Sequence, residues 1–138
     1  MIKAWTYVAA IILLPSAHAS TEHLEKARNS LRNYGLVNCL TMAFPDPSEL
    51  KRDLENASRS YHFMGRGHHE IRQDEETLEA TKDPYKIINN HFSASLKNDP
   101  YEIDRAGNQI VSMRCLEIYN SASLEELVRS FDEYVIFE

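Results

Sequence analysis

Two cysteines in a chain that begins with an export signal constrain this sequence more than any other feature. The first 19 residues contain one basic residue, Lys3, then an apolar run over residues 4–14 and an Ala-x-Ala motif that ends at Ala19. This order is typical of a secretory signal peptide, which is removed after export. The apolar run is far shorter than the roughly 20 residues that span a bilayer. We therefore expect an exported protein in which residues 1–19 are cleaved off after Ala19.

The cysteines, Cys39 and Cys115, both lie in apolar segments with helical spacing. An exported chain with a single pair of cysteines most simply forms one disulfide. In the chain-entropy description, such a long loop stabilises the fold by roughly 4 kcal/mol. The alternative is a catalytic thiol with His62 or His91 as its base. Neither cysteine sits on a Gly-flanked turn, so the sequence favours a structural pair.

The mature segment, residues 20–138, has the size of one small domain, and no linker or repeat divides it. One of the 15 basic residues, Lys3, lies in the signal, which leaves 14 basic against 21 acidic residues and a net charge of −7. Nucleic acids and anionic membranes bind basic surfaces. This charge balance argues against both as partners of the mature protein.

Glycine is scarce, and apolar residues recur at steps of three and four, which predicts an all-α fold. We expect a compact bundle of about six helices, stapled by the disulfide. The expected helices cover residues 21–43, 47–64, 68–81, 84–97, 109–119 and a last segment after Ser123. The first helix has two apolar stripes and should be the central one. Asp46 and Ser123 are the expected N-caps of the second and last helices, and Pro47 and Pro84 the expected first helical residues.

Apolar faces can be assigned to three of these helices. The second helix should bury Leu50, Leu54, Ala57, Tyr61 and Met64; the fourth Tyr85, Ile88, Phe92 and Leu96; the last Leu124, Leu127, Val128, Phe131 and Val135. Residues 98–108 have no such periodicity and contain Pro100 and Gly107. Long loops in compact domains are more often functional or disordered than neutral connectors.

No constellation of residues for catalysis or metal binding stands out, so we expect neither an enzyme nor a bound cofactor. His68 and His69 are adjacent, whereas zinc ligands on a helix usually sit four residues apart. The acidic pairs 75–76 and 125–126 are also consecutive, so on a helix they would not converge on one substrate atom. Neither a Gly-x-Ser-x-Gly motif nor a Gly-rich phosphate loop occurs.

Two segments that contain the cysteines resemble a known family. They are residues 33–40, Asn-Tyr-Gly-Leu-Val-Asn-Cys-Leu, and residues 113–121, Met-Arg-Cys-Leu-Glu-Ile-Tyr-Asn-Ser, followed by Leu124 and Leu127. The sequence resembles the immunity proteins of type VI secretion amidases, in the fourth amidase–immunity class. The resemblance follows the mature chain in order, although residues 56–65 match the family pattern loosely and the acidic residues 68–80 match nothing in it.

The resemblance implies a periplasmic helical homodimer that binds a secreted amidase of the NlpC/P60 Cys-His kind and blocks its active site with a protruding loop. The expected partner-binding residues are those of the loop, namely Asn98, Asp99, Pro100, Tyr101, Glu102, Ile103, Asp104 and Arg105. Phe63, Ile87 and Val37 remain after one core stripe is assigned to each helix, which favours a homodimer. Two alternatives stay open: immunity against another periplasmic toxin, such as a lipase or muramidase, and a small metal- or ligand-binding protein using His62, His68 and His69.

Overall fold

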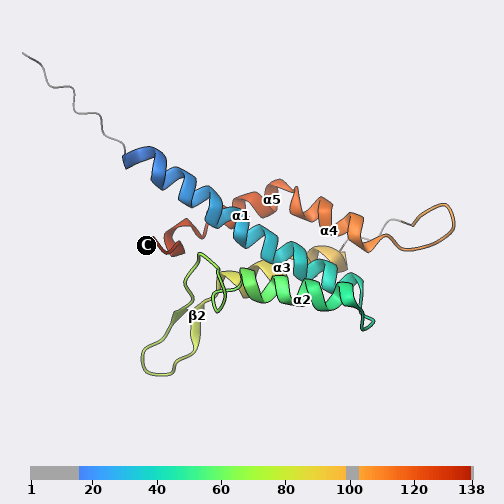
Figure 1. The fold of residues 1–138 in the computed structure, drawn as a ribbon, viewed down its shortest axis with the longest axis horizontal. Helices are drawn as coiled ribbons and strands as arrows, with labels where there is room; N and C mark the ends of the chain where they lie inside the picture. The colour runs from blue at the N-terminus through green and yellow to red at the C-terminus, as the bar shows by residue number, and fades with distance from the viewer. Residues whose placement is uncertain (1–15, 99–102, 138) are drawn as a thin grey trace, which may run out of the picture.

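The computed structural model describes residues 16–98 and 103–137, with side chains from Ser20 onward. Five α-helices occur in these residues: α1 (Ser16–Ala43), α2 (Glu49–Tyr61), α3 (Pro84–Asn98), α4 (Val111–Tyr119) and α5 (Ala122–Arg129) (Figure 1). A small antiparallel sheet of β1 (Arg72–Gln73) and β2 (Ala80–Lys82) lies between α2 and α3, and the 3-10 helix η1 (Asp132–Tyr134) follows α5. The expected helical bundle is confirmed in its main part, with five α-helices and a hairpin in place of six helices.

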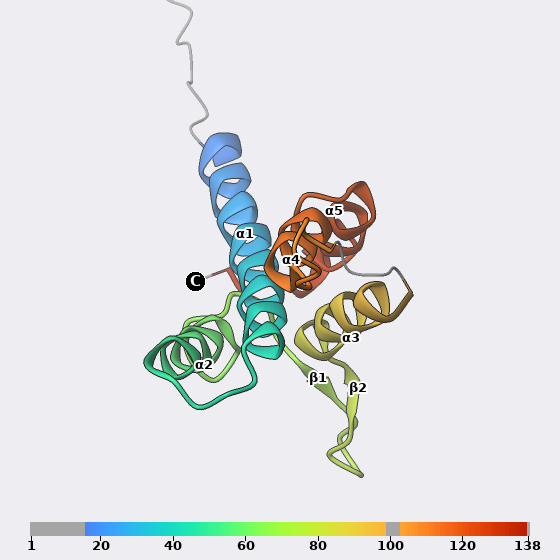
Figure 2. The same cartoon turned by 90° about the vertical axis from the view of Figure 1, so that its right-hand side faces the viewer.

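Helix α1 is central, as its two apolar stripes predicted. It packs against each of the other four α-helices. Figure 2 shows α2 on one side of α1, with α3, α4 and α5 on the other. Ala27, Leu31 and Cys39 on α1 are fully buried at these contacts. The core therefore lies mainly between α1 and the α3–α4–α5 layer.

Helix α3 supplies the largest part of that core. Its predicted apolar face is confirmed, since Tyr85, Ile88, Phe92 and Leu96 are all buried. The Asp83-Pro84 start is confirmed as well, because the Asp83 carboxylate accepts a hydrogen bond from the Lys86 amide at 3.0 Å. Helix α3 crosses α1 closely at Gly35, where an added Cβ would lie 2.4 Å from a ring carbon of Phe92.

Helix α2 differs from its prediction at both ends. Its N-cap is Ser48 in place of Asp46, and the Ser48 hydroxyl accepts from the Lys51 amide at 3.1 Å. The helix ends at Tyr61, so Met64 lies beyond it in a turn and is 82% exposed. No residue of α2 is buried, and its main packing contact is with α1. Leu54, Ala57 and Tyr61 of the predicted stripe are partly buried, but Leu50 is exposed, so the prediction that this face is buried is only partly correct.

The prediction of a helix over residues 68–81 is wrong. Residues 68–70 run beside the C-terminal segment: the Glu70 amide donates to the Tyr134 carbonyl at 2.9 Å, and the Ile136 amide donates to the His68 carbonyl at 2.8 Å. The chain then forms the β1–β2 hairpin, whose turn is held by Asp74. One Asp74 carboxylate oxygen accepts from the Glu76 and Thr77 amides, an aspartate-centred turn that competes with helix formation. The hydrogen-bond partner that makes residues 68–70 extended lies more than 60 positions away in sequence.

The last part of the chain matches its predicted face but not its predicted cap. Ser121, not Ser123, is the N-cap of α5, and its hydroxyl accepts from the Leu124 amide at 3.2 Å. Leu124, Val128, Phe131 and Val135 are buried and Leu127 partly so. Helix α5 ends at Arg129, and η1 then turns the chain back toward the start of α1 (Figure 1).

Candidate partner-binding loop

The predicted disulfide is present and ties the second half of the chain to the first helix. Cys39 of α1 and Cys115 of α4 are bonded, with their Cα atoms 5.8 Å apart, and both side chains are fully buried. Neither cysteine is free. A thiol nucleophile is therefore excluded in this structure, and the pair serves to hold α4 on α1.

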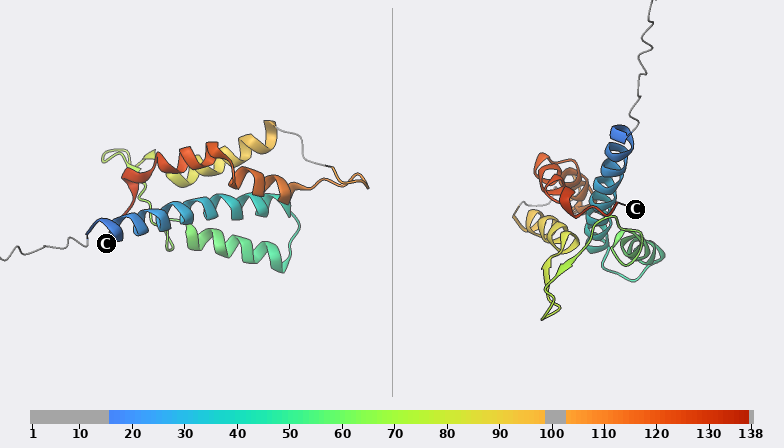
Figure 3. Two further views of the ribbon diagram at one scale, coloured as in Figure 1. Left: turned by 90° about the horizontal axis from the view of Figure 1, so that it is seen from above. Right: turned by 90° about the vertical axis from the view of Figure 1, so that its left-hand side faces the viewer.

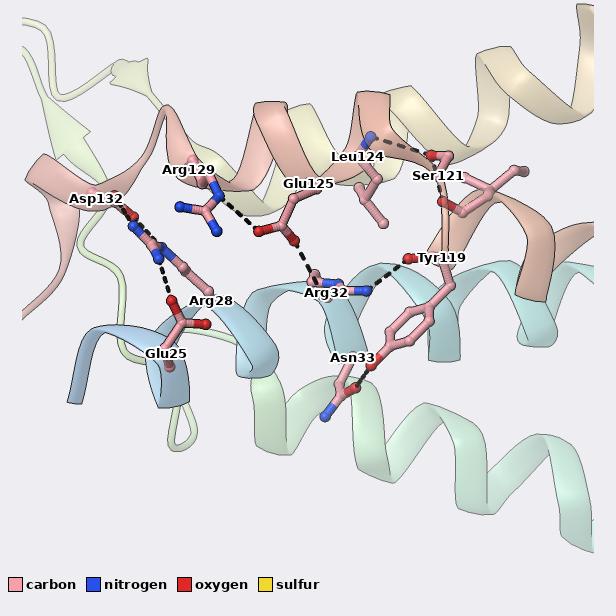
Figure 4. Close-up of polar contacts among 11 residues, drawn as sticks. Glu25, Arg28, Arg32, Asn33, Tyr119, Ser121, Leu124, Glu125, Arg129 and Asp132 are labelled. Atoms are coloured by element: carbon pink, nitrogen blue, oxygen red, sulfur yellow. Dashed lines mark hydrogen bonds and ion pairs between the residues drawn. The ribbon is translucent and has the colours of Figure 1, made fainter. Parts of the chain in front are cut away.

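Polar side chains on α1 extend this attachment toward α5 (Figure 4). Asn33 accepts a hydrogen bond from the Tyr119 hydroxyl at 3.0 Å. Arg32 donates to the Tyr119 carbonyl at 3.0 Å and to Glu125 at 3.2 Å, and its guanidinium lies 4.6 Å from the centre of the Tyr119 ring. The two sequence signatures thus meet in space: Cys39 bonds to Cys115, and Asn33 bonds to Tyr119.

A second polar contact holds the C-terminal part on α1. Arg28 is buried, and its guanidinium pairs with Glu25 on the same helix and with both carboxylate oxygens of Asp132 in η1. Its hydrogen bond to Asp132 raises the pKa of Arg28, against the lowering effect of burial. Arg28 and Arg32 were not singled out from sequence, because an arginine on a helix gives no sign of the distant carboxylate that it will meet.

The predicted partner-binding residues leave this anchored frame between α3 and α4. Asn98 is the last residue of α3 and is exposed. Asp99, Pro100, Tyr101 and Glu102 lie outside the described residues. Ile103, Asp104 and Arg105 are exposed, and residues 103–110 extend beyond the helices at the end of the molecule away from the C-terminus (Figure 3).

The described part of the loop is a defined turn. Ile103 and Gln109 form an antiparallel bridge, and the Asp104 amide donates to the Asn108 carbonyl at 2.9 Å. The Asp104 carboxylate accepts from the amides of Ala106 and Asn108 and from the Asn108 side chain, each at 2.8 Å. These hydrogen bonds, the Asn108 side chain first, lower the pKa of Asp104. The Asp104 carboxylate, which was expected to contact the partner, is therefore engaged in hydrogen bonds that stabilise the turn itself.

Gly107 closes this turn in the left-handed region, with φ of +87° and open space around it. A residue with a side chain is strained in that conformation. The glycine that was read from sequence as a sign of irregular chain is thus a specific part of a hairpin-like tip.

The three histidines considered for metal binding serve other contacts. The His62 ring packs against Tyr85, with ring centres 4.7 Å apart. His69 is fully buried, and His68 lies at the surface next to His23, with ring centres 5.6 Å apart. Within residues 16–98 and 103–137, no group of three or more His, Cys, Asp or Glu side chains is placed to hold a metal ion. In the same part of the chain, no helix is long and apolar enough to cross a membrane.

These features define a class: a small helical protein with a structural disulfide and a shaped loop that projects from an anchored frame. The comparison with protein families is more specific. Residues 29–128 match the family Tai4, the type VI secretion system (T6SS) amidase immunity proteins, and the chain belongs to this family. The match includes both signatures, from Asn33 to Ser121. No curated protein and no solved structure matches the chain significantly.

Membership confirms the resemblance seen in the sequence and identifies the protein as a T6SS amidase immunity protein. Proteins of this kind bind a cognate secreted effector. The disulfide fits an oxidising compartment such as the periplasm.

Proposed function

We propose that this protein inhibits a peptidoglycan amidase of the NlpC/P60 Cys-His kind by filling its active-site groove with residues 98–108. The observation that carries the proposal is the shaped, exposed turn at residues 103–109, which projects beyond the helical frame. A groove that accepts a wall peptide is concave, so its inhibitor needs a narrow convex element. The turn has that form, and its internal hydrogen bonds reduce the entropy lost on binding.

The frame behind the loop supports this role. Both ends of the loop are joined to helices that pack on α1. Helix α3 packs through its buried face, and α4 is held by the Cys39–Cys115 disulfide. A loop held at both ends by rigid elements keeps its geometry while it displaces water from a groove. Inhibition by such a loop requires no chemistry of the immunity protein itself, and both cysteines are already committed to structure.

The composition of the loop is suited to a protein partner. Tyr101 is the expected anchor, because tyrosine buries a large area with little loss of side-chain entropy and is frequent at binding hot spots. Glu102 adds an acidic group that can pair with a basic residue around the groove. Because the Asp104 carboxylate is engaged within the turn, we assign the contact with the amidase to Tyr101 and Glu102 first.

The same proposal includes export to the periplasm with cleavage after Ala19. Near the start of α1, His23 already contacts a distant segment, since its Nε2 lies 2.9 Å from the Ile136 carbonyl. Removal of residues 1–19 leaves this contact and the Arg28 and Arg32 contacts in place. The mature protein thus retains the interactions that hold its C-terminal half on α1.

The test first asks whether a gene for an NlpC/P60-type amidase neighbours the gene for this protein. That amidase, once purified, is assayed with peptidoglycan sacculi as substrate and release of soluble peptide as the readout. Mature wild-type protein should inhibit it. Replacing residues 99–107 with a short Gly-Ser linker should abolish inhibition, and Tyr101→Ala should weaken binding by about 2 kcal/mol or more.

A matched control is the other acidic projection of the molecule, the hairpin tip at residues 74–79. Replacing this tip with the same linker should leave inhibition unchanged. If wild-type protein does not inhibit this amidase, the proposed target is wrong. If the protein without residues 99–107 inhibits as well as wild type, the plug mechanism is wrong, and the surface of residues 50–70 becomes the candidate contact.

A further inference from the structure

The C-terminal segment, residues 130–137, is held by histidines from two parts of the chain. His23 of α1 contacts it through the Ile136 carbonyl at 2.9 Å and through the Phe137 ring, with ring centres 5.1 Å apart. The His68 carbonyl accepts from the Ile136 amide at 2.8 Å, and His69 forms an antiparallel bridge with Val135. The segment closes over the end of the molecule opposite the loop (Figure 3).

His69 lies at the centre of this closure and has no access to solvent. Its backbone is fixed on both sides by α3: its amide donates to the Tyr85 hydroxyl at 3.2 Å, and the same hydroxyl donates to its carbonyl at 3.1 Å. Its imidazole differs from its backbone, because neither Nδ1 nor Nε2 has a hydrogen-bond partner among the described residues. A buried polar ring without partners is unusual in a folded protein and calls for a physical reason.

The charged and titratable groups around His69 offer no compensation for a positive charge. From its own segment come His68, whose charge opposes protonation, and further along Glu70 and Arg72, which pair with each other at 2.8 Å. The C-terminal segment brings Asp132 and Glu133, and α3 brings the neutral Tyr85 hydroxyl. Asp132 favours the charged form, but both of its oxygens already bind Arg28 of α1.

The balance of these effects keeps the buried ring neutral. Burial is the largest cause, the nearby His68 adds to it, and together they lower the pKa of His69 to about 4, against an ordinary value of 6.5. A histidine exposed by local opening returns to its ordinary pKa. The open form therefore binds a proton in a pH range in which the closed form does not.

We propose that His69 is a proton-operated latch: in mildly acidic solution, binding of one proton to its imidazole stabilises an open form in which residues 130–137 have left α1 and residues 68–70. The proton comes from solvent and binds the ring once the segment has opened and water reaches it. The direction of the pH dependence follows from the different pKa values of His69 in the closed and open forms. Since the pKa is lower in the closed form, closure is most favoured at and above neutral pH and is weakened progressively as the pH falls from 6.5 toward 4.

The expected size of the effect is set by one proton. The equilibrium constant for opening should rise by about fivefold between pH 6.5 and pH 5.5, and by about twentyfold between pH 7 and pH 5. Carboxylates with ordinary pKa values stay ionised over most of this range. His23 and His68 also contact the C-terminal segment, so the test depends on substitution of His69 itself.

Amide hydrogen exchange measured by mass spectrometry tests the latch on the mature protein, with rates corrected for the intrinsic pH dependence of exchange. Protection of peptides from residues 130–137 should fall about twentyfold from pH 7 to pH 5, while α3 keeps its protection. His69→Leu should remove this pH dependence, and His69→Gln, which keeps a polar but neutral side chain, should do the same if the leucine variant does not fold.

The matched control is His91→Gln. His91 is another histidine whose pKa is lowered by burial, and its ring packs against Phe92 of the same helix, α3. This variant should keep the wild-type pH dependence. The latch is overturned if protection of 130–137 does not change with pH, if the change persists in His69→Leu or His69→Gln, or if α3 loses protection in parallel, which would indicate global unfolding. Each of these readouts is independent of amidase inhibition.

Discussion

Substituting Gly35 with alanine tests the closest contact in the core. Gly35 lies in the middle of α1, where glycine is less favourable than alanine by about 1 kcal/mol. On helix propensity alone, Gly35→Ala should therefore stabilise the protein by that amount. The structure predicts the opposite sign, because α3 occupies the space that the new methyl group would need.

The magnitude follows from the geometry of this crossing. A Cβ at position 35 would lie 2.4 Å from Cε2 of Phe92 and 2.6 Å from Cγ2 of Ile88. Ordinary carbon–carbon contacts are about 3.5–4.0 Å, so these side chains must move by about 1 Å. Both are fully buried and packed on all sides. Overpacking of this kind costs about 2–3 kcal/mol, and after the gain in helix propensity we expect a net destabilisation of about 1–2 kcal/mol.

Urea unfolding followed by far-ultraviolet circular dichroism, with the disulfide intact, measures this change in the free energy of unfolding. Phe92→Leu removes the ring atoms that clash, so the double variant should be less destabilised than the sum of the two single variants by about 1 kcal/mol or more. Gly107→Ala is the control. It meets open space but a left-handed backbone, so its loss of about 1 kcal/mol should show no coupling to Phe92→Leu. An equally or more stable Gly35→Ala protein would refute the close crossing of α1 and α3.

Two further predictions concern the covalent link and the assembly of the protein. The disulfide joins residues that are 76 positions apart. Replacing both cysteines with alanine should therefore lower the free energy of unfolding by about 4.5 kcal/mol, measured by the same urea titration. A loss below about 1 kcal/mol would contradict that estimate. Light scattering at micromolar concentration should report the mass of a homodimer, for which the exposed Phe63 is a candidate contact, and a monomer mass alone would reject it. Ile87, proposed for the same interface from sequence, packs against the core instead.

The helices predicted from sequence were those with a complete local signal. Residues 84–98 carry a cap, a proline and four apolar residues at steps of three and four, and each of these features has its expected role in α3. The capping serines were harder to choose, because Asp46, Ser48, Ser121 and Ser123 all have suitable chemistry. Only the path of the backbone decides which hydroxyl or carboxylate reaches the first free amides of a helix.

The candidate site, like the helices, could be predicted from the sequence only in part. The loop was located from its lack of periodicity and from Pro100 and Gly107, but its sequence did not reveal that Asp104 and Asn108 build a turn. The family signatures marked Asn33, Cys39, Cys115, Tyr119 and Ser121 without their contacts. The structure explains these residues as the two sides of one attachment between α1 and the α4–α5 segment.

The sequence by itself determined which segments are helical around the core, that the cysteines pair and that the chain belongs among the T6SS amidase immunity proteins, because each of these follows from local patterns or from short motifs. The tertiary structure decided that residues 68–82 form an extended segment and a β-hairpin in place of a helix, that α2 stays at the surface and that the His69 ring is buried without a hydrogen-bond partner among the described residues. The physical reason is that each of these depends on neighbours far along the chain. The backbone of residues 134–136 completes the hydrogen bonds of residues 68–70, and His69, which forms a bridge with Val135, is fully buried.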